Sequence, residues 1–180
     1  RTLTLGYAVA FADLLLAPPW IIAMLALFVA AAHAVRLWLW QPWRTLGTPM
    51  VWVLHVAYAW IVVYLVLRGL AAAGLVSELF AVHALTIGAI GGLTIGMMTR
   101  TARGHTGRPL VADNFEVTCY ILVAVAAAIR VFGGMLLPGA YLATVVASAL
   151  CWSAAFSLYV VRYWPVLSRP SLVLRTASGC

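Results

Sequence analysis

The chain has 180 residues, the length of one ordinary domain. Hydrophobic residues make up 66% of it and charged residues 8%, whereas a soluble chain is about half apolar and about a quarter charged. This composition excludes a soluble domain, a disordered segment and a disulfide scaffold, and it indicates a polytopic membrane protein. The three cysteines include no close pair, so no zinc motif is predicted.

The charged residues are unusual in kind as well as in number. All 11 basic residues are arginines, and four acids leave a net charge of +7. In a soluble protein this excess would suggest nucleic acid as a partner. In a membrane chain it is a topology signal, because short loops rich in arginine stay in the cytoplasm. The expected partner is therefore the lipid bilayer and not nucleic acid.

Five apolar segments are long enough to span a bilayer, which takes about 20 residues of helix. They are residues 20–38, 50–68, 78–99, 115–137 and 140–163. A sixth apolar segment, 3–17, is short and ends at two prolines, which cannot continue a helix. The sequence predicts an all-α transmembrane bundle of about six spans, forming a single domain over 1–180. Because the chain begins with Arg rather than Met, we expect it to be part of a longer protein.

The arginines alternate with the predicted spans. Only Arg68 falls on one side of the membrane, and Arg130 falls inside a span. The other nine fall on the opposite side, where arginine-rich loops indicate the cytoplasm; they are Arg1, Arg36, Arg44, Arg100, Arg103, Arg108, Arg162, Arg169 and Arg175. Both ends of the segment are therefore predicted to be cytoplasmic.

Two histidines lie at nearly equal depth in consecutive antiparallel spans. His33 is four residues before Leu37, about 6 Å from the cytoplasmic end, and His55 is six residues after Pro49, about 9 Å from that end. A haem iron or another metal needs imidazoles arriving from facing elements in this way. We hypothesise that the two histidines share one centre. The alternative is that each is only a hydrogen-bonding residue in the bundle.

A second group of polar residues is expected in the other half of the membrane. His83 lies about 7–8 Å deep from the outer side, and Asp13, Glu78 and Arg130 fall toward that side. A buried arginine needs a partner, which Asp13, Glu78 or a bound anionic group could supply. His83 is therefore predicted to serve a centre separate from that of His33 and His55.

The fourth span carries a ribbon of three glycines. Gly88, Gly92 and Gly96 are spaced so that a helix or a flat cofactor can approach the backbone, and we favour helix packing. Met97 and Met98 follow, and their thioethers suit haem iron or Cu(I). Packing is again the favoured interpretation of both methionines.

The loop after this span has a distinctive order, Gly-His-Thr-Gly-Arg-Pro over 104–109. It predicts a tight turn, in which His105 could coordinate a metal or, with its arginine neighbours, hold an anion. Asp113 followed by Glu116 predicts a capped helix start. Trp38, Trp40 and Trp43 are predicted to form an interfacial belt without a role in a site.

Several of these segments together resemble the NnrS family. The resemblance covers nearly the whole chain, and the fourth span with its loop is the most specific part. The matching segments are 84–91, 98–100 and 104–109, with His33 to Arg36, Pro42 to Thr45, Trp52 to His55 and Tyr58 upstream, and Arg162 to Leu167 downstream. The tail 171–180 departs from the polar ending usual in the family.

The resemblance implies a multi-pass protein of the bacterial inner membrane with about a dozen spans. It implies haem and copper as cofactors, nitric oxide as a ligand, and a role in denitrification and in the response to nitrosative stress. The chain resembles the C-terminal half of the family, so a missing N-terminal half would complete its sites.

The candidate site residues come from this resemblance and from the burial of Arg130. The four histidines are candidate metal ligands, and Arg100, Arg108 and Arg130 are candidate cofactor-binding residues. The residues that match the family pattern are His33, His55, His83, His105, Arg100 and Arg108. Which histidine binds haem and which binds copper stays open.

A cofactor-free transporter or channel subunit is the main alternative function. The glycine-rich span and Arg130 would then line a pathway through the membrane. A purely structural role is disfavoured, because lipid-facing packing needs neither the histidines nor Arg130. We expect no catalysis, since no nucleophile with a base, no paired carboxylates and no phosphate-cradling loop is present.

Overall fold

The computed structural model describes residues 17–169. This part of the chain is helical without strands, and five of its helices are long and apolar enough to cross a membrane. They are Pro19–Leu39, Pro49–Ala72, Glu78–His105, Asn114–Leu136 and Pro138–Leu167. The predicted all-α membrane bundle and its five clear spans are confirmed. The short sixth segment, 3–17, lies outside the described residues.

Two of the five long helices change their winding along their length. The first two spans are α2 (Pro19–Leu39) and α3 (Pro49–Ala72), joined through the 3-10 turn η1 (Pro42–Thr45). The third consists of α4 (Glu78–His83), the π-helix η2 (Ala84–Ile90) and α5 (Gly91–His105). The fourth consists of α6 (Asn114–Ala128), the π-helix η3 (Ile129–Gly133) and α7 (Gly134–Leu136). A 3-10 turn, η4 (Pro138–Ala140), leads into α8 (Tyr141–Leu167).

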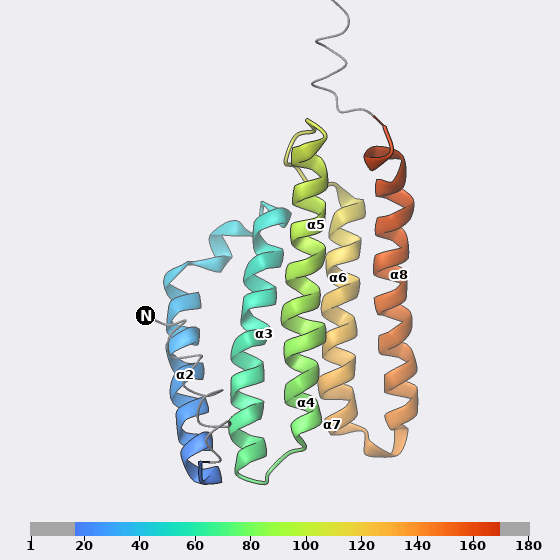
Figure 1. Cartoon of the computed structure of the whole chain (residues 1–180). Coiled ribbons are helices and arrows are strands. Elements are labelled where there is room, and N and C mark those ends of the chain that lie inside the picture. The colour runs from blue at the N-terminus through green and yellow to red at the C-terminus, as the bar shows by residue number, and fades with distance from the viewer. Residues whose placement is uncertain (1–16, 170–180) are drawn as a thin grey trace, which may run out of the picture.

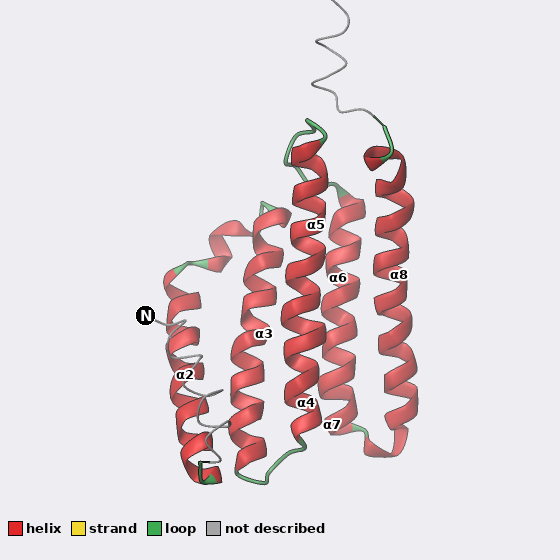
Figure 2. Ribbon diagram, viewed as in Figure 1, coloured by secondary structure: helices red, strands yellow, loops and turns green. Residues whose placement is uncertain are grey.

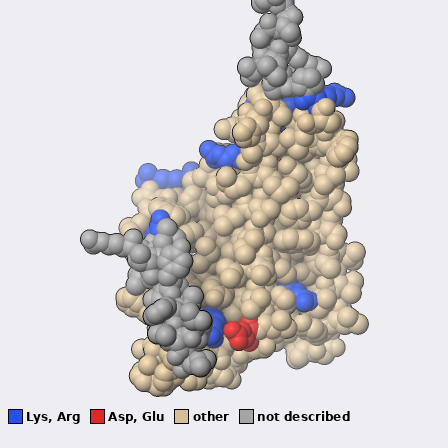
Figure 3. Space-filling model, viewed as in Figure 1, with Lys and Arg blue, Asp and Glu red and all other residues tan. Residues whose placement is uncertain are grey.

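The helices stand antiparallel in chain order, and each packs on the next (Figure 1). Short loops join them, as Figure 2 shows. The ends of α2, α5 and α8 lie at the same end of the bundle as the starts of α3 and α6. We call this the arginine-rich end, and basic side chains gather there on the face shown in Figure 3. The described arginines at this end are Arg36, Arg44, Arg100, Arg103, Arg108, Arg162 and Arg169.

Three helices run further than the sequence indicated. α3 continues past the expected end of its span at residue 68 to Ala72, and α5 continues to His105, which was expected in a loop. α8 continues through Pro165 to Leu167. A proline removes one backbone N–H, and so close to the end of the helix few hydrogen bonds depend on it.

The glycine ribbon is a packing surface for α3. A Cβ atom added at Gly88 would lie 2.4 Å from the Trp60 ring, and one added at Gly92 would lie 2.8 Å from Ala57 Cβ. Gly96 faces the same helix. The approaches at Gly88 and Gly92 are closer than a Cβ atom allows, so these glycines set the spacing of the two helices. The favoured interpretation, helix packing, is confirmed.

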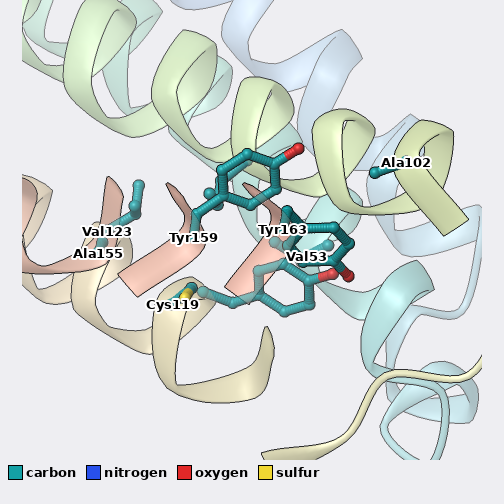
Figure 4. Packing of buried hydrophobic residues seen from close by; sticks show 9 residues of the cluster. Val53, Ala102, Cys119, Val123, Ala155, Tyr159 and Tyr163 are labelled. Atoms are coloured by element: carbon teal, nitrogen blue, oxygen red, sulfur yellow. The ribbon is translucent and has the colours of Figure 1, made fainter. Parts of the chain in front are cut away.

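The largest buried cluster lies toward the arginine-rich half and joins α8 to its neighbours. Tyr159 and Tyr163 project from α8 among Cys119 and Val123 of α6 and Ala102 of α5 (Figure 4). The two tyrosine rings stack with their centroids 4.6 Å apart. This packing carries Tyr163 to the polar groups at the ends of α5 and α6.

Candidate functional site

The first histidine pair lies on two adjacent helices near the arginine-rich end. His33 of α2 is buried, and its Nδ1 lies 2.6 Å from the hydroxyl of Tyr58 on α3. The Nδ1 atom of His55 lies 3.4 Å from Oγ1 of Thr45 in η1. Each ring is therefore oriented through Nδ1 by a hydroxyl group, as neighbouring groups orient imidazole in metal sites.

An aromatic residue that we assigned only to the interfacial belt joins this pair. The Trp40 ring lies 6.0 Å from the His55 ring and 4.8 Å from the Tyr58 ring, measured between centroids. The Arg36 guanidinium lies 4.7 Å from the Trp40 ring. The structure thus brings His33 and His55 to one aromatic surface, and sequence reasoning missed Trp40 as part of it. The only indication in the sequence that aromatic residues lie beside these histidines was the position of Tyr58, one helical turn after His55.

His83 and Arg130 form the second group, at the opposite end of the bundle. Nε2 of His83 and Nη1 of Arg130 are both buried, and neither has a hydrogen-bond partner among residues 17–169. Arg130 lies in η3, which packs against α4, the helix that ends at His83. Its guanidinium lies 5.7 Å from the centroid of the Tyr141 ring. Two buried nitrogen atoms at this end therefore lack a hydrogen-bond partner among the described residues.

The expected acidic partner at this end is engaged elsewhere. Glu78 is exposed, and its Oε1 lies 3.6 Å from Nε of Arg68. No carboxylate of the described chain forms an ion pair with Arg130. Asp13 lies outside the described residues. Glu78, one of the predicted partners of Arg130, is therefore paired with Arg68 instead.

Both members of the second group sit at π-helical turns. His83 is the residue before η2, and Arg130 is inside η3; α4 packs against η3. Just before η3, the Ser148 hydroxyl of α8 donates a 2.7 Å hydrogen bond to the Ala126 carbonyl. Short π-helical turns are rare and concentrate at functional sites. Hydropathy and spacing carry no signal for them.

A network of hydrogen bonds surrounds Glu116 at the arginine-rich end. This side chain is 1% exposed, and its Oε1 accepts hydrogen bonds of 2.6 Å from Arg103 Nη2 and 2.6 Å from the Tyr163 hydroxyl. Its Oε2 accepts a 2.8 Å bond from the Asp113 backbone N–H. The buried carboxylate is fully paired, which is what a buried charge requires.

The cap predicted at Asp113 is confirmed. Asp113 and Glu116 form a reciprocal capping box at the start of α6, and Asp113 Oδ2 lies 2.8 Å from Nη2 of Arg162. Hydrogen bonding with Glu116, the Phe115 N–H and the charge of Arg162 lower the pKa of Asp113 to about 2, against the smaller opposing effect of burial.

The tight turn predicted after the fourth span is also confirmed. Gly107 has a φ of +70°, and the Arg108 N–H donates to the Arg103 carbonyl at 2.9 Å. The Gly107 N–H donates to the Gly104 carbonyl at 3.2 Å. This is the Schellman arrangement, in which a left-handed glycine closes the helix. It folds Arg108 back over Arg103.

His105 lies apart from the other histidines, on the last turn of α5. It is exposed, and it lines a cavity of about 350 Å³ together with Met97 and Met98. Arg100 is exposed on the same helix, and Arg108 lines a different cavity that contains no histidine. The seven predicted site residues are therefore distributed over several places in the bundle.

The donor groups do not assemble into one closed metal site. Among residues 17–169, no three His, Cys, Asp or Glu side chains lie together as a metal would need. His33 with His55, His83 with Arg130, and His105 with two methionines form three separate places. A single imidazole would suit haem iron as a ligand, and thioethers would suit a soft ion such as Cu(I).

These features define a polytopic helical membrane protein with separated, histidine-based polar sites. The sequence model of one family, described as NnrS protein, matches residues 1–171. The chain belongs to the NnrS family. No curated protein and no solved structure matches it.

Proposed function

We propose that this chain is a haem- and copper-binding membrane protein of the nitric oxide response. Membership in the NnrS family suggests that response and also haem and copper as cofactors. The same membership supports a role under nitrosative stress and in denitrifying bacteria. The family membership supports a bacterial inner membrane as the location, and the arginine distribution supports an orientation with the arginine-rich end in the cytoplasm.

The observation that carries the haem proposal is the unpaired Nε2 atom of His83. A buried imidazole nitrogen without a hydrogen-bond partner is costly in an apolar medium, and coordination of iron through its lone pair would satisfy it. Arg130 beside it fits an anionic group, such as a propionate of the cofactor. Haem iron supplies a site that binds nitric oxide. The chain supplies the ligand atom, the cation and an apolar surrounding that excludes water.

His33 and His55 form a second proposed metal centre. Their two imidazoles arrive from neighbouring helices, and hydroxyl groups of Tyr58 and Thr45 hold them through Nδ1. Two such ligands suit either haem iron or copper. The Trp40 and Tyr58 rings would exclude water from the metal.

His105 with Met97 and Met98 offers the donor set best suited to Cu(I). Two thioethers and an imidazole are soft to intermediate ligands, and the three residues line one cavity. Residues beyond 17–169, or another segment of the protein, would complete the coordination at each centre.

Metal analysis and an optical spectrum of the purified full-length protein test the proposal. We expect iron in a stoichiometric amount, a haem absorption band, copper, and a shift of the haem band when nitric oxide is added. A colourless protein without iron and copper would overturn the proposal and favour the cofactor-free transporter.

The shared centre of His33 and His55 has its own test. We expect the metal content or the spectrum to change in both His33→Ala and His55→Ala. Arg44→Gln, an exposed change in the neighbouring η1 turn, serves as the control. Unchanged spectra and metal content in both histidine variants would contradict the proposal of a shared centre.

A further inference from the structure

A cavity of about 310 Å³ opens at the arginine-rich end, between the ends of α5 and α8 and the start of α6. Its lining includes three arginines and one buried carboxylate, with apolar groups beside them. The lining residues are Arg103, Arg108, Pro109, Glu116, Arg162, Tyr163 and Val166. This cavity contains none of the histidines proposed as metal ligands.

The charges in this cavity do not cancel. Arg103 directs Nε and Nη2 to Glu116 and Nη1 to the Pro109 carbonyl, so its donors are largely used. Arg162 uses Nη2 on Asp113. The guanidinium of Arg108 makes no polar contact with the described residues. The three guanidinium groups have two carboxylate partners, Glu116 in the lining and Asp113 paired with Arg162, which leaves one cation and its donors for an anion.

The arrangement of the chain holds Arg108 in place. The left-handed Gly107 and the Arg108 N–H bond to Arg103 fix its backbone. Arg108 is half-buried rather than extended into solvent, unlike Arg44 or Arg100 at the same end. A guanidinium held in this way presents a preformed fork to phosphate oxygens.

An apolar surface adjoins the cavity along α8. A second cavity of about 290 Å³ lies on this helix, and Tyr163 lines both. It is lined by Tyr159, Val160, Tyr163, Trp164, Leu167 and Ser168. Only 17% of the most apolar stretch of α8 is buried inside the described bundle, against 28–44% in the other four long helices. The surface next to the arginines is therefore open to acyl chains.

We propose that this cavity binds the phosphate headgroup of an anionic phospholipid, with an acyl chain lying along α8. Arg108 and the free donors of Arg162 hold the phosphate. Tyr163 separates the headgroup from the chain. Basic pockets between helix ends at the cytoplasmic side of a membrane bind anionic headgroups by this chemistry. An inorganic phosphate would use the arginines but not the apolar surface, so the lipid gains contacts that the free ion lacks.

Lipid retention by the purified full-length protein tests the proposal. The protein is placed in nanodiscs of phosphatidylcholine with a small fraction of phosphatidylglycerol, and bound lipids are counted by native mass spectrometry. We expect one phosphatidylglycerol to be retained in preference to phosphatidylcholine. Arg108→Gln is expected to weaken this retention about tenfold, since it removes a charge-assisted contact.

Matched variants separate the cavity from general surface charge. Arg44→Gln removes one charge at the same end outside the cavity and is expected to retain the lipid within about twofold. Arg108→Lys, which keeps the charge but loses the fork, is expected to lie between wild type and Arg108→Gln. Equal loss in Arg44→Gln and Arg108→Gln would overturn the site.

The source of the phosphate is tested by competition. Millimolar inorganic phosphate is added to the nanodiscs, and Trp164→Ala is compared with wild type. Retention of the lipid against free phosphate, together with weaker retention in Trp164→Ala, supports the phospholipid. Displacement by inorganic phosphate with no effect of Trp164→Ala would overturn it in favour of a free anion. Haem and copper content, measured on the same samples, reports on the proposed function separately.

Discussion

The buried polar groups at the two ends of the bundle differ in whether they have hydrogen-bond partners. At the arginine-rich end, Glu116 is 1% exposed and receives hydrogen bonds from a guanidinium, a hydroxyl and a backbone N–H. At the opposite end, His83 Nε2 and Arg130 Nη1 are buried with no partner among residues 17–169. The buried carboxylate of Glu116 is satisfied within the described chain, and the two buried nitrogen atoms at the opposite end are not.

This difference distinguishes buried polar groups that stabilise the fold from buried polar groups that are available to bind a ligand. A buried network with every group satisfied holds helices in register. A buried donor without an acceptor costs free energy, about 1–3 kcal/mol when neutral and more when charged. His83 Nε2 and Arg130 Nη1 are the two buried nitrogen atoms without a partner at the opposite end, and the proposed function places a further group there. The following changes test this contrast, in order of expected effect.

Removal of the charge of Glu116 should have the largest effect. Glu116→Gln removes the nearer of the two counter-charges of the mostly buried Arg103 and leaves Asp113 at 3.7 Å, which costs about 3 kcal/mol. The measurement is thermal unfolding in detergent. Glu78→Gln is the matched control, because that side chain is exposed at 64% and its pair with Arg68 contributes less than about 1 kcal/mol. Equal shifts of the melting temperature in both variants would contradict the claimed difference between the buried and the exposed carboxylate.

Packing, rather than polarity, should stabilise the helix that carries His83. Gly88→Ala places a Cβ atom against the Trp60 ring and should destabilise the protein by about 2 kcal/mol. Gly104→Ala, further along the same long helix, meets only Leu110 Cδ2 at 4.0 Å. It should be neutral or stabilising by up to about 1 kcal/mol. Thermal unfolding of the pair checks this prediction, and a tolerated Gly88→Ala would contradict the close approach of the helices.

The effect of replacing Arg130 on stability should depend on whether the cofactors are bound. In cofactor-depleted protein, Arg130→Met removes an unpaired buried donor and should stabilise by about 1 kcal/mol or leave stability unchanged. In protein purified with its cofactors, the same change should lower both the melting temperature and the bound cofactor. Equal loss of stability in both preparations would show that Arg130 has a partner within the chain.

The pH dependence should be smallest and should arise at the arginine-rich end. The folded-state pKa of Asp113, about 2, lies below its ordinary value of 3.8, so its ionised form adds stability above pH 3.8. This contribution is lost as the pH falls toward 2. It amounts to about 1 kcal/mol once solvent screening is allowed for, since Asp113 is 46% exposed.

Asp113→Asn isolates the charge in this test, because asparagine also caps helices well. The melting temperatures of variant and wild type should differ at pH 6 and converge as the pH approaches 2. A difference that stays constant over this range would mean that the carboxylate charge does not contribute.

Sequence reasoning was most successful where one physical signal dominated. Long apolar runs gave the five described spans, the spacing of Gly88, Gly92 and Gly96 gave a packing surface, and Asp113 with Glu116 gave a cap. Each of these is a local pattern with a local cause. The sixth span, 3–17, lies outside the described residues.

The geometry of the candidate sites could be predicted only in part. The equal depth of His33 and His55 correctly predicted that they lie in one region, but the contact of Trp40 with His55 depends on how the end of α2 packs against α3. The pairing of Glu116 with Tyr163 joins residues 47 apart in the chain. The π-helical turns at His83 and Arg130 change the winding without any hydropathy signal. Tertiary packing determines all three.

The most direct measurement is the optical spectrum and iron content of purified wild-type protein beside His83→Ala. We expect a haem band in the wild type, and we expect the variant to lose iron or to show a shifted band, because the unpaired Nε2 atom is gone. An identical spectrum and an identical iron content in both proteins would contradict a bound group at the opposite end.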